Sequence, residues 1–237
     1  MPHIRGTADF ALANLPPGLS RLVDLGCGDG CLAAVLLSRL PVCRATLVDV
    51  KLHLELHAVL EAHGVSERAE FVEETVSRLS DRLPAASADL VTCRSALHHF
   101  PQPAAVLREV RRLLAPGGRL LLCDAFFGDP GRAVWSALNH VREAGFVNYY
   151  TYHEILDLLD QASLRADLIR PYTFTHSGLG PYLRPAPAEA REPLERAIRN
   201  LDAETRRQMG LAVRSGRVSF RYRCFDLLAS PIGGRTP

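Results

Sequence analysis

The chain has 237 residues, 47% of them hydrophobic, and its 28 basic and 26 acidic side chains leave a formal net charge of +2. This length suffices for one large domain with a full core, and the balanced charges exclude a strongly basic nucleic-acid-binding protein. No run approaches the roughly 18 apolar residues of a membrane helix, and residues 1–10 lack the apolar segment of a signal peptide. The six scattered cysteines form no C-x-x-C pair. We therefore expect a cytoplasmic globular protein with reduced thiols and no membrane contact.

Apolar runs alternate with segments of helical period through the first half. Runs that are apolar throughout are typical of parallel strands buried on both faces, and short crossovers between them predict a doubly wound α/β fold. The expected strands are residues 21–25, 45–50, 69–72, 88–93 and 119–127, and the expected helices are 30–40, 52–63 and 104–115, the last ended by "PGG" at 116–118.

The second half is less regular. A helix at 152–161 and strands at 164–174 and 217–230 are expected, which makes seven strands in all. We predict one domain over residues 1–237, with a cofactor-binding core at about 20–127 and helical cap insertions on the substrate side at about 128–150 and 177–216.

The stretch "RLVDLGCGDG" at residues 21–30 follows the first strand with alternating glycines. A dinucleotide site has the spacing G-x-G-x-x-G, whereas Gly30 comes one residue early. Asp24 and Asp29 would repel a pyrophosphate here but attract a cationic, phosphate-free ligand. S-adenosylmethionine, with its ammonium and sulfonium groups, is such a ligand, and Asp24 is placed to attract its amino-acid end. Asp49, at the tip of the next strand, would accept hydrogen bonds from both ribose hydroxyls.

Four motifs together resemble the class I S-adenosylmethionine-dependent methyltransferases: "VDLGCGDG", "LVDV", "ADLVTCRSALHHF" and "VLREVRRLLAPGGRLLLCD". These motifs are most similar to those of methyltransferases that act on small molecules, such as the ubiquinone and menaquinone C-methyltransferases and their relatives in secondary metabolism. The resemblance covers residues 20–125 and implies a Rossmann-like sheet whose last strand is antiparallel. Many members of that family have an acid after the third strand that contacts adenine; the residues here are Glu73, Glu74 and Thr75, with Thr75 at the aligned position and Glu74 adjacent, so the chain departs from the family pattern. The implied cofactor contacts are Asp24, Gly26, Cys27, Gly28, Asp49, Val50, Glu74, Thr75, Val76, Cys93 and Arg94.

Two histidines follow the fourth strand, at the edge where a doubly wound sheet binds its ligand. Methyl transfer from a sulfonium is an in-line displacement, so the protein mainly aligns the nucleophile with the methyl group. A base near neutral pKa would assist a weakly acidic acceptor, which makes His98 and His99 the candidate catalytic residues. The alternative is that these imidazoles cap the next helix or line the cofactor pocket.

The substrate side carries aromatic and basic residues. Clustered aromatic side chains suit a flat or apolar acceptor, although they would also serve to pack a lid helix on the sheet. In the last strand Val218, Phe220 and Tyr222 alternate with Arg217, Ser219 and Arg221, on a strand expected to be covered on both faces. We predict that Arg217 or Arg221 pairs with an acidic group of a small-molecule acceptor, the alternative being salt bridges to cap helices. The candidate substrate-binding residues are His140, Tyr149, Tyr150, His176 and Arg221.

Other interpretations stay open. An acid at the position of Asp49 also occurs in NAD sites, so an NAD(P)-binding oxidoreductase is one alternative. A methyltransferase-like fold used for another S-adenosylmethionine-dependent reaction, or only for binding, is a second. His53 and His57 have the i,i+4 spacing of metal ligands but no evident third ligand, so we expect a solvent-facing helix and no metal site.

Overall fold

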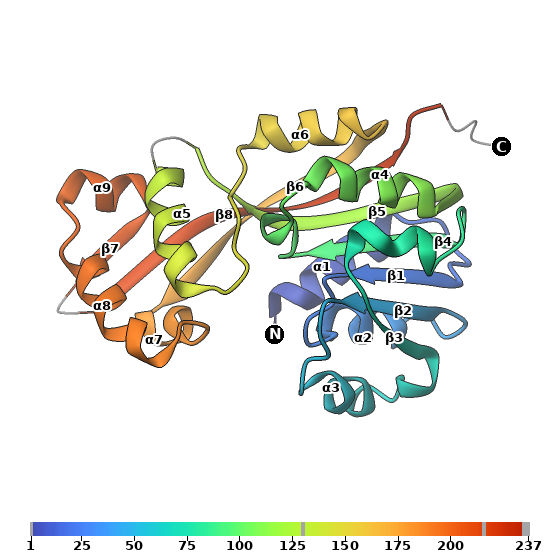
Figure 1. Cartoon of the computed structure of the whole chain (residues 1–237), viewed down its shortest axis with the longest axis horizontal. Helices are drawn as coiled ribbons and strands as arrows, with labels where there is room; N and C mark the ends of the chain where they lie inside the picture. Colours follow the sequence, from blue (N-terminus) through green and yellow to red (C-terminus); the bar gives the residue numbers. More distant parts are fainter. Residues whose placement is uncertain (1, 129–130, 215–216, 234–237) are drawn as a thin grey trace.

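The computed structural model describes residues 2–128, 131–214 and 217–233, and its centre is a single mixed sheet (Figure 1). The strand order is β3-β2-β1-β4-β5-β8-β6, with β7 paired to β8. The first five strands pair in parallel, and β8 is antiparallel to β5, β6 and β7. The strands are β1 Arg21–Leu25, β2 Arg44–Asp49, β3 Ala69–Glu73, β4 Ala88–Arg94, β5 Leu114–Phe126, β6 Leu164–Ser177, β7 Leu211–Arg214 and β8 Arg217–Pro231.

This order confirms the doubly wound α/β fold and the antiparallel last strand. In the described residues, the seven expected strands are all present and form one continuous path, and an eighth strand, β7, pairs with β8 off that path. The additional strand, β7, lies inside the segment that was expected to be a helical insertion. Pairing with the first residues of β8 satisfies its backbone hydrogen bonds, and Leu211 is buried there.

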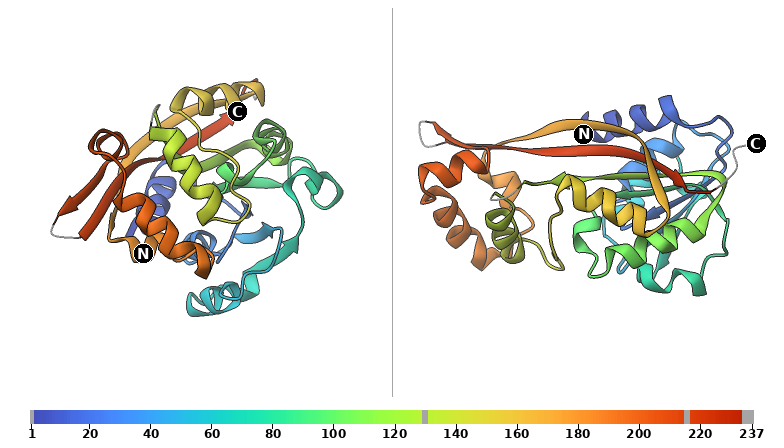
Figure 2. Two further views of the ribbon diagram at one scale, coloured as in Figure 1. Left: turned by 60° about the vertical axis from the view of Figure 1, so that its left-hand side comes forward. Right: turned by 90° about the horizontal axis from the view of Figure 1, so that it is seen from above.

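Helices cover both faces of the sheet (Figure 2). One face packs against α4, α6 and η2, and the other against α1, α2 and α3. No helix in the described residues is long and apolar enough to cross a membrane. The helices are α1 Pro2–Asn14, α2 Cys31–Leu37, α3 Leu56–Ala62, α4 Pro103–Leu113, α5 Gly131–Arg142, α6 Tyr152–Gln161, α7 Leu179–Leu183, α8 Ala188–Arg199 and α9 Ala203–Gln208, with short 3-10 turns η1 Ser66–Arg68, η2 Val76–Asp81 and η3 Leu97–His99.

Two local features differ from the sequence-based expectation. Helix α1 was not anticipated; it buries Ile4 and Ala8, and Thr7 Oγ1 donates a hydrogen bond to the buried Asp226 at 2.8 Å. The "PGG" segment does not end a helix but lies within β5. Helix α4 ends at Leu113, and Leu114 is already extended and paired with Ala88, so a register shift before residue 119 absorbs the two glycines.

Strands β6 and β8 continue past the rest of the sheet and support a second group of helices (Figure 2). We call this part, formed by the ends of β6 and β8 with β7, α5, α7, α8 and α9, the cap lobe. It has its own aromatic core, in which Phe220 lies 5.3 Å from Trp135 and 4.9 Å from Tyr182 between ring centroids. Val218 and Phe220 face this core, which confirms the predicted alternation.

The other face of β8 is not covered in the cap lobe. Arg217 and Arg221 lie there and are exposed. The expectation that this strand is covered on both faces therefore holds for residues 224–230, which are all buried, but is wrong for residues 217–223, where exposed arginines need no buried partner.

Candidate cofactor and acceptor site

The glycine turn after β1 has the backbone geometry that only glycine adopts without strain. Gly26, Gly28 and Gly30 all have positive φ, at 63°, 55° and 72°. A Cβ at Gly26 would lie 2.6 Å from the Cβ of Ala96, whereas a Cβ at Gly28 would meet no atom within 4 Å. The turn therefore packs closely against the segment after β4 at Gly26 and is open at Gly28.

Asp49, at the tip of β2, holds the turn in place. Its Oδ2 accepts the backbone N–H of Gly28 at 2.9 Å, and its Oδ1 accepts that of Val50 at 2.8 Å. His53 Nε2 lies 3.8 Å from Oδ2. Each carboxylate oxygen has two lone pairs, so Asp49 retains acceptor capacity toward the open side of the turn.

Asp24 is 2% exposed and accepts a hydrogen bond from Thr92 Oγ1 at 2.5 Å. Burial raises the pKa of this carboxyl to about 6, although the Thr92 hydrogen bond and the nearby Arg94 guanidinium act in the opposite direction. Arg94 lies at the end of β4, the strand that pairs with β1. A buried acid and a guanidinium thus lie together below the turn.

Two adjoining cavities open at this edge of the sheet, of about 740 Å³ and 500 Å³. We call them the large and the small cavity; they share Gly26, Gly28, His53 and Ser95. Of the residues predicted to bind the cofactor, Gly26, Gly28, Asp49, Val50, Glu74, Thr75 and Val76 line the large cavity, and Asp24, Gly26, Cys27, Gly28 and Arg94 line the small one.

Cys93 lines neither cavity. It is 2% exposed and pairs in the sheet with Leu25 and Leu122, and burial raises its pKa well above the usual value for a thiol. Glu73 also lines neither cavity. Glu74 lines the large cavity; its carboxylate accepts the Thr75 N–H at 2.9 Å and lies 3.4 Å from Arg82 Nε.

The residues at the turn fit S-adenosylmethionine. Asp49 offers acceptors for a ribose diol, the segment from Glu74 to Val76 borders the same cavity, and Asp24 with Arg94 offers one charge of each sign for an amino-acid end. The glycine backbone is open at Gly28, and two carboxylates face the space where a pyrophosphate would lie.

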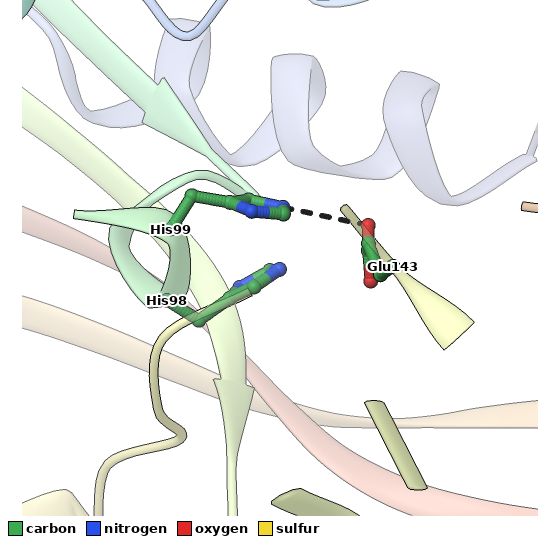
Figure 3. Close-up of side chains that lie close together, drawn as sticks. All are labelled: His98, His99 and Glu143. Atoms are coloured by element: carbon green, nitrogen blue, oxygen red, sulfur yellow. Dashed lines mark ion pairs between the residues drawn. The ribbon is translucent and has the colours of Figure 1, made fainter. Parts of the chain in front are cut away.

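His99 lies at the wall of the large cavity, and His98, which lines neither cavity, lies beside it with the two rings side by side (Figure 3). His98 is 6% exposed, and its Nδ1 contacts both Asp124 oxygens at 2.8 and 3.0 Å. His99 lines the cavity, and its Nε2 lies 3.4 Å from Glu143 Oε1. The structure thus separates the two candidates into a buried imidazole and one at the cavity wall.

The pKa values of the cavity-wall pair move apart. Burial alone would lower the pKa of His99, but the hydrogen bond and the charge of Glu143 outweigh it and raise that pKa. Burial alone would raise the pKa of Glu143, but His99 and the Arg142 guanidinium lower it to about 2. The contact between the two groups therefore favours the imidazolium form of His99 and the carboxylate form of Glu143.

Glu143 and Asp124 were missed by the sequence analysis. Glu143 directly follows α5 and reaches the site because the cap lobe carries that helix over the end of the sheet. Asp124 is the acid of "LLLCD", near the end of β5. The available signal was that β4 and β5 are neighbouring parallel strands, so their ends bring Asp124 close to the two histidines after β4.

None of the five residues predicted to bind substrate lines either cavity. His140 is exposed, with Nδ1 2.8 Å from Ser136 O, and Arg221 is exposed on the open face of β8. Tyr149 is buried, with its ring centroid 4.4 Å from that of Phe127, and Tyr150 is half-buried. His176 stacks on Phe220 at 4.6 Å, and burial lowers its pKa to about 4.

Residues 4–167 match the family model described as a methyltransferase domain. The chain belongs to this family. The match confirms the predicted methyltransferase family and, with it, S-adenosylmethionine as the cofactor.

Similar proteins point the same way. A ubiquinone biosynthesis O-methyltransferase of Xanthomonas axonopodis pv. citri is 34% identical over 118 residues, which are 48% of this chain and 46% of that protein. The chain thus spans about half the length of the curated relatives it matches. The YcgJ protein of Bacillus subtilis has the same fold, with a TM-score of 0.81 at 22% identity, covering 99% of this chain and 100% of that one.

A third similar structure is a 1,6-didemethyltoxoflavin-N1-methyltransferase of Burkholderia thailandensis, solved with its substrate and S-adenosylhomocysteine. Its TM-score is 0.55 at 19% identity, covering 94% of this chain and 77% of that one.

Proposed function

We propose that the protein transfers the methyl group of S-adenosylmethionine to a hydroxyl group of a small apolar molecule. The observation that carries this proposal is the continuity of the site. One large cavity extends from Asp49 and Glu74, on the cofactor side, to His99 and Glu143 at its far end.

The cofactor would be held by residues at the strand tips. Asp49 would accept the ribose hydroxyls, Glu74 to Val76 would border adenine, and Asp24 with Arg94 would bind the methionine end. The bound cofactor supplies an electrophilic methyl group on its sulfonium. The chain's task is then to exclude water and to align the acceptor with that methyl group.

The acceptor end of the large cavity has an apolar wall and a charged pair. Phe100, Pro101 and Pro185 form its apolar wall, which supports an aromatic or other flat acceptor. The polar pair is His99 and Glu143, which we propose to contact the acceptor's hydroxyl, while the buried His98 positions His99. The ionised Glu143 and the distant Arg221 give no support to an acidic acceptor, and the named O-methyltransferase relative supports oxygen as the methylated atom.

We further propose that residues 1–237 act as one domain in the cytoplasm. The β8 strand runs through both the main sheet and the cap lobe, so the two parts share one hydrogen-bonded structure. The six cysteines are all free thiols, five of them buried, which supports a reducing compartment.

The test is calorimetry with S-adenosylhomocysteine and, separately, with NAD⁺. Wild-type protein is expected to bind only the former, and Asp49→Asn to weaken that binding at least tenfold because charged hydrogen bonds worth about 1.5–3 kcal/mol are lost. Asp160→Asn, the same change at an exposed position on α6, serves as the control. Binding of NAD⁺ without S-adenosylhomocysteine would refute the proposal.

The acceptor is then sought by incubating the protein with S-adenosylmethionine and a panel of flat phenols. Mass spectrometry is expected to show one added methyl group on a hydroxylated member and none on its O-blocked analogue. Methylation of amines or carbon centres alone would contradict oxygen as the methylated atom.

A further inference from the structure

Three side chains from two parts of the fold meet beside the acceptor end of the large cavity, which His99 and Glu143 line. His98 and His99 come from η3, and Glu143 comes from the segment after α5 (Figure 3). One ligand atom from each lies within 4.8 Å of the other two. The two rings lie 4.4 Å apart between centroids, and both point toward the carboxylate.

The spacing of these atoms is that of a metal site. A tetrahedral ion with bonds of about 2.0–2.1 Å holds neighbouring ligand atoms about 3.3 Å apart. His99 Nε2 and Glu143 Oε1 are 3.4 Å apart, and all three ligand atoms lie within 4.8 Å of one another, so the cluster would contract around a bound ion. Two imidazoles and one carboxylate are a ligand set for divalent transition metals.

Each imidazole is also oriented from behind. Metal-binding histidines usually donate their second ring N–H to a carboxylate or a main-chain carbonyl. Asp124 accepts from Nδ1 of His98, so Nε2 is the atom that remains for a ligand. The ring of His99 makes a hydrogen bond to the main chain of Gly145, which leaves its Nε2 toward Glu143.

The remaining charges at the site leave one oxygen of Glu143 for a metal. The guanidinium of Arg142 binds the other oxygen, Oε2, and is itself held by Asn139 Oδ1 and the carbonyl of Tyr182. Arg142 therefore stays on the far side of the carboxylate. His99 and Glu143 are partly exposed to the cavity, while His98 closes the cluster from the protein interior.

We propose that His98, His99 and Glu143 bind one divalent transition-metal ion, with Zn²⁺ as the probe, and that its open positions face the large cavity. The next step rests on the proposed function: the hydroxyl oxygen of the acceptor would be a further ligand of the bound ion. Coordination to a divalent ion lowers the pKa of such a hydroxyl, so its proton passes to water before the oxygen is methylated. This extends the role of the pair from contact with the acceptor to selection of an oxygen acceptor.

The test is calorimetric titration of the full-length, chelator-treated chain with Zn²⁺ at neutral pH. We expect one ion per chain with a Kd in the micromolar range or tighter, and a Kd raised at least tenfold in Glu143→Gln and in His99→Gln. Two matched controls, His140→Gln on α5 and His57→Gln on α3, remove exposed histidines outside the cluster and are expected to keep the wild-type Kd.

A second measurement needs no variant. Co²⁺ bound to the wild-type chain should show the visible absorption of nitrogen and oxygen ligation, without a thiolate charge-transfer band. Absence of Zn²⁺ binding, a thiolate band, or an equal loss in His57→Gln or His140→Gln would overturn the proposal. Binding of S-adenosylhomocysteine by Glu143→Gln would show that this variant is folded. If the wild-type chain does not bind S-adenosylhomocysteine, the proposed function is refuted, but the proposed metal site is not.

Discussion

Replacing Asp24 by Asn should make the ligand-free protein more stable at neutral pH while weakening its cofactor binding. The folded-state pKa of Asp24 is about 6, against 3.8 for an aspartate exposed to water, because the group is buried. That difference is about two units, and each unit corresponds to about 1.4 kcal/mol. The ionised carboxylate therefore costs the folded protein about 3 kcal/mol at pH 7.

The sign of this effect fixes its pH dependence. Because the folded-state pKa is raised, Asp24 adds stability below about pH 4, and this stability is lost as the pH rises through 6. Asparagine has the same shape, does not titrate, and can still accept the Thr92 hydrogen bond. The unfolding free energy of the variant relative to that of the wild type should thus rise by up to about 3 kcal/mol between pH 4 and pH 7.

Urea denaturation of both proteins over pH 4–8 measures this difference, and other carboxyl groups cancel in the subtraction. Calorimetry with S-adenosylhomocysteine should show a Kd raised at least tenfold, since a charged hydrogen bond worth about 1.5–3 kcal/mol is lost. A stability difference that does not change with pH, or one that changes in favour of the wild type, would refute the reasoning.

Two further substitutions test how the turn and α6 are built. Gly30→Ala places a Cβ 2.4 Å from Leu56 Cδ1, whereas the Cβ of Gly28→Ala meets no atom within 4 Å. Both variants should lose about 1–2 kcal/mol of unfolding free energy because φ is positive, and Gly30→Ala should lose about 1–3 kcal/mol more because of the clash. Equal losses in urea denaturation would argue against the clash. Thr151→Ala removes the capping box of α6 and should cost about 1 kcal/mol, seen as a lower Tm. Thr175→Ala, at an exposed strand position, should have a much smaller effect, and a comparable fall in Tm would contradict the capping role.

The cofactor half could be predicted from the sequence because its signals are local. Continuous apolar strands, the glycine spacing and the acids Asp24 and Asp49 follow one another along the chain, and the structure brings them to the same edge. The role of Asp49 in holding the turn through the Gly28 N–H follows from the parallel pairing of β1 and β2.

The acceptor half could not be predicted because its geometry depends on distant contacts. Glu143 reaches His99 only because β6 and β8 carry the cap lobe beyond the sheet. Arg221 was misjudged since sequence alternation shows two faces of a strand but not which of them is covered. Likewise, Tyr149 lies in the aromatic core of the cap lobe and His176 stacks on Phe220, and neither lines the large or the small cavity.

The long antiparallel ribbon of β6 and β8 limits how the molecule can move. From Leu164 to Ser177 the two strands stay paired, and they pass from the main sheet into the cap lobe without an intervening loop. A lid on a flexible tether could swing open widely, but this ribbon permits mainly bending and twisting. Small molecules should therefore enter and leave through small movements of the cavity rim near Pro185. Substitutions at this rim can change which acceptor binds without altering the residues that hold the nucleoside.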